Sequence, residues 1–431
     1  MDFQKEYKKK LVTVDDILAK IKSNDIILPA LVGCEPTAVL QRIHEIDNRV
    51  ENVRIYATLE FNQFPFKDPN VDVKNIKTMS YFFGAGSRGL HPLKRATLLP
   101  CHLRNFCSFG LESKRPNIFM ASVTPMDRFG YFTMSLSQVL ERPFLEAADM
   151  VVLEVNDQMP RVQGDTMVHI SEVDYIYEHS HDIVSIAAQK PGEKEKKIGK
   201  YIADFVEDGD TFQLGIGAIP NAVAESMMQK KDLGIHTEMF TEGMMELMQA
   251  GVVTNRKKTV HRGKTVATFA LGSKKLYDFL HDNPAIAMLE GGYVNNPYVI
   301  AQNNNMISIN TTLQVDLTGQ CCSESIGNRQ YSGIGGQTDT VLGALMSPNG
   351  RSVIALLSTT KDEKISKITP FLTEGAAVTL SRNDVDYIVT EYGVAKMRGM
   401  SIAERAENLI NIAHPKFREE LKASAEKLHI W

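Results

Sequence analysis

Short apolar runs bounded by turn residues alternate along this chain with helical patterns. Such runs indicate strands, and strands separated by helical segments indicate parallel pairing, because a parallel neighbour is reached only through a long crossover connection. The sequence therefore predicts an α/β fold with buried, mainly parallel sheets. The clearest predicted strands are residues 54–61, 117–123, 150–155, 265–271 and 386–393.

An approximate internal repeat indicates two domains of similar plan. VGCEPTAVL (32–40) matches IGAIPNAVA (216–224) at a glycine, a proline and an Ala-Val pair, and each copy follows an acidic turn and a short apolar run. Each half is expected to open with a strand, a glycine turn and a helix begun by proline. A chain of 431 residues also exceeds what one hydrophobic core usually serves. The polar stretch 189–197 is the expected boundary, giving domains 1–188 and 189–431.

The sequence predicts where two helices begin. Thr13 with Asp16, and Ser401 with Glu404, have the spacing of a capping box ahead of apolar positions. We therefore expect helices to begin after Thr13 and Ser401.

Two glycine-rich segments offer bare backbone to a ligand. FQLGIGAIPNAV (212–223) places Gly215 and Gly217 between a predicted strand and helix, where amides and the helix dipole can hold an anion or a carbonyl oxygen. YSGIGGQTD (331–339) concentrates Gly335 and Gly336 in a loop that follows a strand-like alternation at 308–319. A structural turn remains the alternative for each segment.

GAGSRG (84–89) satisfies the glycine spacing of a dinucleotide-binding turn, but no helical pattern follows it. Pro92 and Pro100 interrupt the next residues, and no acidic ribose partner is convincingly placed. A nucleotide-binding oxidoreductase or regulatory module would rest on this motif alone.

GIHTEMFTEGMMEL (234–247) carries Glu238 in an apolar neighbourhood. If residues 235–240 form a strand, His236, Glu238 and Phe240 share one face. A glutamate is ionised at neutral pH and can attack an acyl group without a general base. Spacing alone favours the alternative of an ordinary surface glutamate.

Composition excludes several classes of function. A net charge of −4 with both signs interspersed offers no basic face for nucleic acid or an anionic membrane, and no apolar run has the length of a membrane span. No signal-peptide pattern is present, so we expect a cytoplasmic protein.

The cysteines and histidines do not predict a metal site. The five cysteines lack CxxC spacing and are expected to be reduced and mostly buried. His179 with His181 has no third ligand at recognisable spacing, so no metal is assigned.

Several long segments together resemble the acetyl-CoA hydrolase/transferase family, most closely its 4-hydroxybutyrate and butyryl-CoA:acetate CoA-transferases. The resemblance spans nearly the whole chain, and it is carried by the segments VNDQMPRVQGDTMVHIS, GIHTEMFTEG, QVDLTGQCCSESIGNRQYSGIGGQTD, ISKITPFLTEGAAVTLSRNDVDYIVTEYGVAKMRG and INIAHPKFREEL.

The resemblance implies two domains of the NagB/RpiA/CoA-transferase type and a ping-pong reaction through a glutamyl-CoA thioester. Glu238 takes the place of the family's catalytic glutamate. The remaining implied positions meet CoA or its oxyanions, and they are Gly215, Ile216, Gly217, Ala218, Ile219, Leu313, Gly335 and Gly336.

The implied substrates are a short-chain acyl-CoA and acetate, with no further cofactor, and relatives suggest a homodimer. Thr237 stands where the family usually has Ser, and Thr241-Glu242 where it has Ser-Asp. These departures bear on the substrate pocket more than on the mechanism. An acyl-CoA hydrolase that uses the same glutamate, and a CoA-binding protein without catalysis, remain the alternatives.

Overall fold

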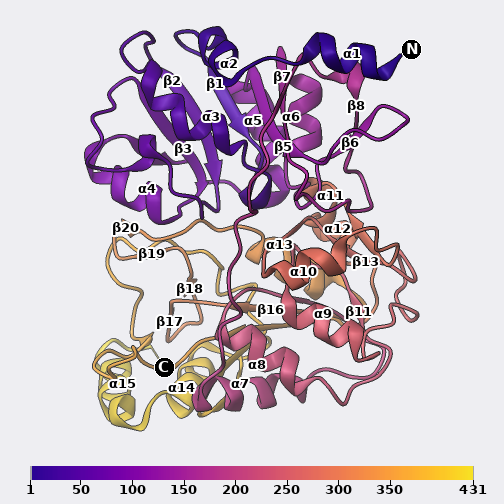
Figure 1. Cartoon of the computed structure of the whole chain (residues 1–431). Coiled ribbons are helices and arrows are strands. Elements are labelled where there is room, and N and C mark those ends of the chain that lie inside the picture. The colour runs from indigo at the N-terminus through magenta and orange to yellow at the C-terminus, as the bar shows by residue number, and fades with distance from the viewer. Residues whose placement is uncertain (1, 431) are drawn as a thin grey trace. The chain divides into compact units, whose positions relative to one another are not determined.

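The structure, a computed structural model, describes residues 2–430 of the chain. Internal contacts divide the chain into two compact units, Met1–Ile186 with Ala267–Tyr293 and Ala187–Val266 with Val294–Trp431 (Figure 1). The sequence predicted a boundary between two domains at residues 188 and 189. Units defined by internal contacts do not test where independently folding domains begin, so this boundary stays a prediction. The contacts add that segment 267–293 packs with the first unit, which no sequence pattern indicated.

A seven-stranded sheet forms the centre of the first unit, in the order β4-β3-β2-β1-β5-β7-β9. Every neighbouring pair in it is parallel. Its strands are β1 (Ile26–Pro29), β2 (Val53–Thr58), β3 (Ile76–Phe82), β4 (Ala96–Leu98), β5 (Ile118–Val123), β7 (Met150–Val155) and β9 (Tyr175–Glu178). The predicted strands at 54–61, 117–123 and 150–155 are thereby confirmed.

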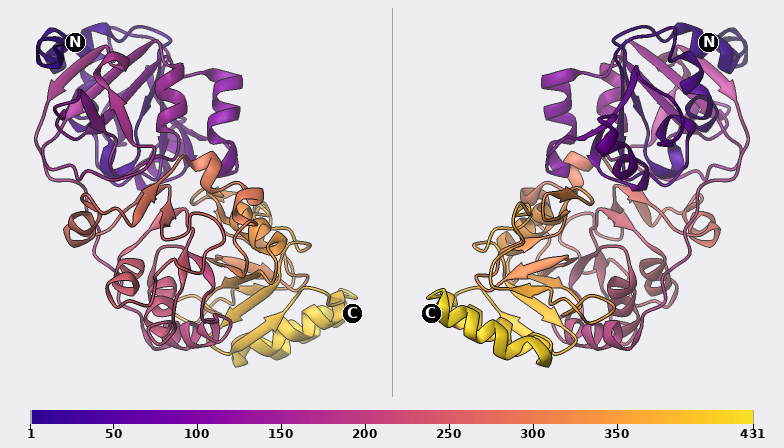
Figure 2. Two further views of the ribbon diagram at one scale, coloured as in Figure 1. Left: turned by 90° about the vertical axis from the view of Figure 1, so that its right-hand side faces the viewer. Right: turned by 90° about the vertical axis from the view of Figure 1, so that its left-hand side faces the viewer.

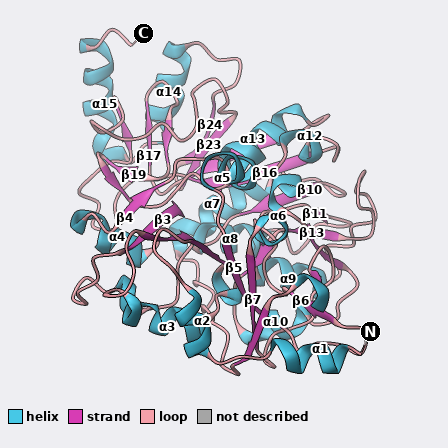
Figure 3. Cartoon of the chain, turned by 90° about the horizontal axis from the view of Figure 1, so that it is seen from above, coloured by secondary structure: helices cyan, strands magenta, loops and turns pink. Residues whose placement is uncertain are grey.

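Helices and short strands complete the first unit. Among the short strands, β6 (Tyr131–Thr133) pairs antiparallel with β8 (Met167–His169), and β14 (Phe269–Ala270) and β15 (Ile286–Met288) lie in segment 267–293. The helices are α1 (Phe3–Lys10), α2 (Val14–Lys20), α3 (Thr37–Arg42), α4 (Ala85–Leu90), α5 (Phe106–Lys114), α6 (Glu141–Ala147) and α10 (Lys274–Leu280). Figure 3 distinguishes the helices, in cyan, from the strands, in magenta. The core is built where α2 and α3 pack their apolar side chains on the sheet, for example Ile17 and Leu40 with Ile55.

The second unit is built on a six-stranded sheet in the order β11-β10-β16-β21-β23-β24. All its neighbours are parallel except β23 and β24. The strands are β10 (Thr211–Leu214), β11 (Gly234–Ile235), β16 (Met306–Thr311), β21 (Arg351–Ala355), β23 (Tyr387–Thr390) and β24 (Gly393–Lys396). β23 confirms the first part of the strand predicted at 386–393, and the last predicted residue already belongs to β24.

Helices α14 (Ile402–Ile412) and α15 (Pro415–Lys427), yellow in Figure 2, close the core of the second unit. Leu409 of α14 and Leu421 of α15 are buried with Ile388 of β23. The other helices are α7 (Glu193–Ala203), α8 (Ala218–Ser226), α9 (Glu242–Gln249), α12 (Pro297–Ile300) and α13 (Gln337–Met346), and α11 (Gly291–Val294) lies where the chain passes between the units.

Three predicted strands divide in the structure. Residues 308–319 supply the end of β16 and then β17 (Gln314–Asp316), which pairs with β18 (Cys321–Cys322) and β22 (Ile368–Thr369) in another sheet. The prediction of one continuous strand was wrong, because alternation of side chains continues while the backbone changes partners. Likewise 235–240 divides into β11 and β12 (Met239–Phe240), and 265–271 into β13 (Thr265–Ala267) and β14 (Phe269–Ala270).

Both predicted capping boxes are confirmed. The Thr13 hydroxyl accepts from the Asp16 amide at the start of α2, and Ser401 and Glu404 form the same reciprocal pair at the start of α14. The two halves of the repeat also share their plan, since β1 leads through a turn to α3 and β10 through a turn to α8.

The five cysteines are free, and all except half-buried Cys101 are buried, as the sequence predicted. Among the described residues, no helix combines the length and the apolar character that crossing a membrane requires.

Candidate active site

Three of the predicted site segments follow neighbouring parallel strands of the second unit. β10 runs into the turn 215–219, β11 leads to Glu238, and β16 is followed by Leu313. Because β11, β10 and β16 are adjacent and parallel, their carboxyl ends lie at one edge of the sheet. Ligands of open parallel sheets bind at this edge, where backbone turns and side chains are free of the strand ladder.

Glu238 lies between β11 and β12 and is half-buried. Its Oε2 accepts a hydrogen bond of 2.9 Å from the Nδ2 of Asn295. Burial raises the pKa of Glu238 to about 7, and the neighbouring Asp339 adds to the rise, whereas the Asn295 bond and a backbone hydrogen bond from Gly336 lower it. Near neutral pH this carboxyl group therefore exchanges between its ionised and protonated forms.

Gly336 is packed directly against this pair. A Cβ added there would overlap both the Asn295 amide and Oε2 of Glu238. Gly335 precedes it with φ of +55°, a left-handed conformation that favours glycine. α13 begins at the next residue, and Asp339 in its first turn is buried. The second glycine segment thus lets backbone reach the carboxylate, as a ligand-contacting loop requires.

The turn 215–219 presents backbone rather than side chains. Gly217 has φ of +120° and precedes α8, whose first turn contains Ala218, Ile219 and Pro220. A Cβ added at Gly215 would meet nothing within 4 Å. Ile216 is 47% exposed, although it is apolar. An exposed apolar residue between two open glycines is suited to contact with a ligand.

Thr237 connects Glu238 to the start of this turn. Its Oγ1 lies 3.2 Å from the carbonyl oxygen of Met239 and 3.5 Å from that of Leu214. The hydroxyl group that the family usually supplies from serine is therefore retained here by threonine, with an added methyl group.

Leu313 follows β16 and is half-buried. Its amide donates to the carbonyl oxygen of Cys322 at 3.0 Å, which ties it to the small sheet of β17 and β18. The structure thus brings Glu238 and Gly336 into contact, and places Leu313 and the 215–219 turn at the same edge of the sheet.

Asn295, which binds Glu238, and Lys258, which binds the carbonyl oxygen of Ile235 in β11, were not among the residues predicted from the sequence. Asn295 lies 57 positions from Glu238 in the chain and directly follows α11. Lys258 is 3% exposed and donates through Nζ to the carbonyl oxygens of Ile235 and Lys264, each at 2.7 Å. Burial lowers the pKa of Lys258 to about 7. Asn295 and Lys258 are recognised only from the folded structure.

In the first unit, Glu154 lies close to the pair of histidines His179 and His181. Donor atoms of Glu154, His179 and His181 lie within 4.8 Å of one another. The Glu154 carboxylate already accepts from the amides of Thr37 and Ala38 and faces the His181 Nε2 at 3.0 Å. The Glu154 carboxylate is therefore engaged by the start of α3 and by His181, and the ring of His179 stacks on that of His181.

The polar groups of the GAGSRG motif bind another part of the protein. Residues 85–90 form α4, and both the amide and the hydroxyl group of Ser87 donate to buried Glu60. A Cβ at Gly84 would meet the Glu60 backbone at 2.8 Å. The glycine is explained by close packing, and a carboxylate of the protein takes the place of a phosphate.

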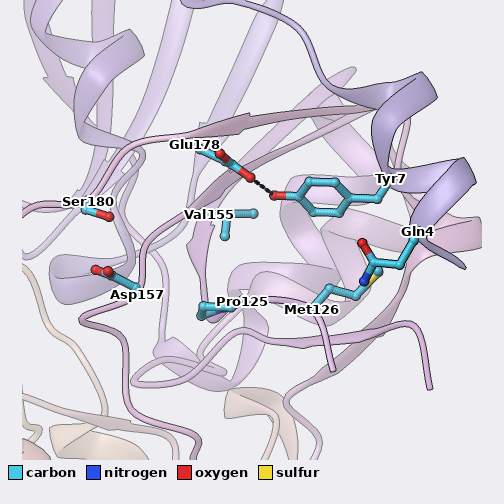
Figure 4. Close-up of a pocket in the computed structure, with 8 residues that line it drawn as sticks. All are labelled: Gln4, Tyr7, Pro125, Met126, Val155, Asp157, Glu178 and Ser180. Atoms are coloured by element: carbon cyan, nitrogen blue, oxygen red, sulfur yellow. Dashed lines mark hydrogen bonds between the residues drawn. The ribbon is translucent and has the colours of Figure 1, made fainter. Parts of the chain in front are cut away.

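A pocket of about 350 Å³ lies elsewhere in the first unit (Figure 4). The Tyr7 hydroxyl donates across it to Glu178 at 2.7 Å. Its lining contains none of the predicted site residues, and comprises Gln4, Tyr7, Pro125, Met126, Val155, Asp157, Glu178 and Ser180. The candidate site is accordingly the edge of the second sheet around Glu238.

Two α/β units, each with a mainly parallel sheet, and a glutamate at a strand end are the features expected of the CoA-transferase class. The N-terminal domain of acetyl-CoA hydrolase/transferase matches residues 1–188, and its C-terminal domain matches residues 272–425. The chain belongs to the acetyl-CoA hydrolase/transferase family.

Two relatives match this chain over nearly the full length of both proteins. 4-Hydroxybutyrate coenzyme A transferase of Clostridium kluyveri is 43% identical over 428 residues, 99% of this chain and 100% of that protein. Butyryl-CoA:acetate CoA-transferase of Anaerostipes caccae is 36% identical over 449 residues, 100% of this chain and 99% of that protein. The crystal structure of RipA from Yersinia pestis superposes with a TM-score of 0.94 at 37% identity, and the match covers 100% of both chains.

Proposed function

We propose that this chain is a CoA-transferase that moves CoA from a short-chain acyl-CoA, butyryl-CoA or 4-hydroxybutyryl-CoA, to acetate. The observation that carries the proposal is the half-buried Glu238, held by Asn295 and packed against Gly336. Support also comes from the names of the two relatives, which act on 4-hydroxybutyrate and on butyryl-CoA with acetate.

Glu238 is the nucleophile in this scheme. Its carboxylate attacks the thioester carbonyl, forming an acyl-glutamyl anhydride and expelling CoA as a thiolate. The thiolate then attacks the glutamyl carbonyl, which releases the first carboxylate and leaves a glutamyl-CoA thioester. Acetate reverses both steps and leaves as acetyl-CoA. Since each product must depart before the next substrate reacts, the kinetics are ping-pong.

The Asn295 bond assigns different tasks to the two oxygens of Glu238. Asn295 holds Oε2, which leaves Oε1 to bond with the acyl carbon. Oε2 then becomes the glutamyl carbonyl oxygen and bears negative charge when the thiolate attacks. The Asn295 amide already points at it, and one such preorganised donor is typically worth about 10²- to 10³-fold in rate. Amides of the 215–219 turn and of Gly335 or Gly336 are further donors for the substrate oxyanion.

Water must be kept from the glutamyl thioester, because its hydrolysis would dissipate the bond that the transfer conserves. Met239 and Phe240, 5% and 0% exposed, follow the glutamate directly and supply apolar surface. An acyl-CoA hydrolase using the same glutamate is the second candidate. CoA release from butyryl-CoA without added acetate would favour the hydrolase.

The proposal needs no cofactor beyond the CoA thioester, since the carboxylate and amides perform every step. A cytoplasmic homodimer completes it, on the strength of the family resemblance. Which acyl group is preferred depends on the side chains around the acyl carbon, and the two relatives differ in the acyl group that their names give.

The decisive experiment is peptide mass mapping after the protein is incubated with butyryl-CoA and no acceptor, with borohydride trapping in parallel. A CoA adduct, or its reduced product, on the peptide that contains Glu238 is the expected result. A Glu238→Gln variant treated in the same way is the matched control and must remain unmodified. An unmodified Glu238 peptide beside consumed thioester would refute the covalent mechanism.

A further inference from the structure

His236 lies two residues before Glu238 and is 1% exposed. Its Nε2 is 2.8 Å from the carbonyl oxygen of Val294. Val294 immediately precedes Asn295, whose Nδ2 donates to Glu238. Two side chains of the 236–238 segment are thus joined to two consecutive residues of the 294–295 segment.

The hydrogen bond fixes the chemical form of His236. A carbonyl oxygen can only accept, so Nε2 carries the proton and the ring donates to Val294. Among the described residues Nδ1 has no hydrogen-bond partner, so a proton there would be buried and unpaired. Burial, with the charge of nearby Lys258, lowers the pKa of His236 to about 3. The ring therefore remains a neutral donor near neutral pH.

Asn295 depends on this bond for its placement. Its side chain is 0% exposed, and its Oδ1 has no partner in the described part of the chain. The side-chain amide of Asn295 is oriented by its hydrogen bond to Glu238. The backbone of Asn295 is held through the preceding residue, because the carbonyl group of Val294 accepts a hydrogen bond from His236. A shift of Val294 would therefore move the amide relative to Oε2.

We propose that His236 is a positioning residue for the transfer reaction: through Val294 it holds the Asn295 amide against the Oε2 of Glu238. The inference rests on the proposed function, because it assigns His236 a role in the chemistry of that carboxylate. His236 itself touches neither substrate nor the reacting oxygens.

The test replaces His236 in two ways. His236→Leu supplies an apolar side chain of similar reach that donates no hydrogen bond, whereas the terminal amide of His236→Gln can replace the Nε2 donor. We expect kcat of the Leu variant to fall about 10²-fold, the effect of a displacement of about 1 Å. KM for butyryl-CoA should change less than about threefold, since CoA contacts are untouched. The Gln variant should recover most of kcat.

The pH profile separates positioning from a general loss of stability. The Asn295 bond lowers the pKa of Glu238, so weakening it should move the acid limb of kcat/KM to higher pH in the Leu variant. The groups that set this limb are Glu238 itself and Asp339, which faces it. Leu409→Ala, in the buried cluster under α14, is the control, because it lowers the thermal midpoint without touching the site.

The outcomes distinguish the inference from the proposed function. A parent protein that forms no adduct on Glu238 would remove the proposed function and the inference with it. A parent that forms the adduct, beside a Leu variant whose kcat is within about threefold and whose acid limb is unmoved, would overturn the inference alone. If the Leu variant does not fold, His236→Asn, too short to reach Val294, must show the same shift of the acid limb.

Discussion

Replacing Glu238 by Gln should make the protein more stable at pH 8 while abolishing transfer. Glutamine has the shape of the carboxyl group and can still accept from Asn295, but it carries no charge. The parent must hold a carboxylate at a half-buried position where burial opposes ionisation. Burying a charged group in an active site lowers the stability of the folded protein. Such groups are a common reason why function and stability oppose each other.

The magnitude follows from the pKa of Glu238, which burial raises from 4.5 to about 7. Between these two values the folded chain keeps a proton that the unfolded chain has lost. Folding therefore takes up a proton in this window, and the free energy of unfolding decreases as the pH rises. Each pH unit in this window lowers the free energy of unfolding by about 1.4 kcal/mol. Above pH 7 the total decrease is therefore about 3 kcal/mol. Below pH 4.5 it is absent.

Thermal unfolding of ligand-free parent and Glu238→Gln between pH 5 and pH 8 measures this difference. At about 2–4 °C per kcal/mol, the advantage of the variant should grow by several degrees over that range. Glu246→Gln, at an exposed position of α9, removes the same formal charge and serves as the control. A difference in midpoint that is the same at pH 5 and pH 8, or a parent that is the more stable protein at pH 8, would refute the reasoning.

Four further outcomes are expected. Glu238→Asp withdraws the carboxylate by about 1 Å and should lose roughly 10²-fold in kcat; steady-state transfer within a few-fold of the parent contradicts the nucleophile. Gly336→Ala should lose at least about 10²-fold in kcat, whereas Gly86→Ala, whose Cβ would make ordinary contact with the Lys67 side chain at 3.4 Å, should keep it. Initial rates of the parent should rise with pH through about 7 as Glu238 ionises, and a flat profile from pH 6 to 8 contradicts this. Ser401→Ala removes a cap and should lower the free energy of unfolding by about 1 kcal/mol in urea titrations.

The sequence predicted the strands that are long, apolar and bounded by turns. β2, β5, β7 and β23 are of this kind, since a buried parallel strand is apolar on both faces. It failed at residues 308–319, where alternation of side chains was continuous. There β16 ends and β17 begins in a different sheet. Alternation reports which face a side chain occupies, and it is the same whichever strand pairs alongside.

The candidate site was predictable only in part. The glycines at 217 and 335 can be found because a positive φ favours glycine, and the structure gives both positions that conformation. Glu238 was chosen through the family resemblance, because spacing alone favoured an ordinary surface glutamate. Asn295 and His236 could not be assigned their roles, because each depends on a contact between segments more than fifty residues apart.

The geometry explains why the nucleophile lies in the short gap between two strands. A residue within a strand points fully to one face, whereas Glu238 follows β11 at the carboxyl edge and can turn toward residues that arrive from elsewhere. Asn295 comes from the end of α11 and Gly336 from the start of α13, and both meet the same carboxylate. A side chain at position 336 would exclude the amide, and a longer strand would turn the carboxylate away. The site therefore depends on the point where β11 ends as much as on the identity of the glutamate.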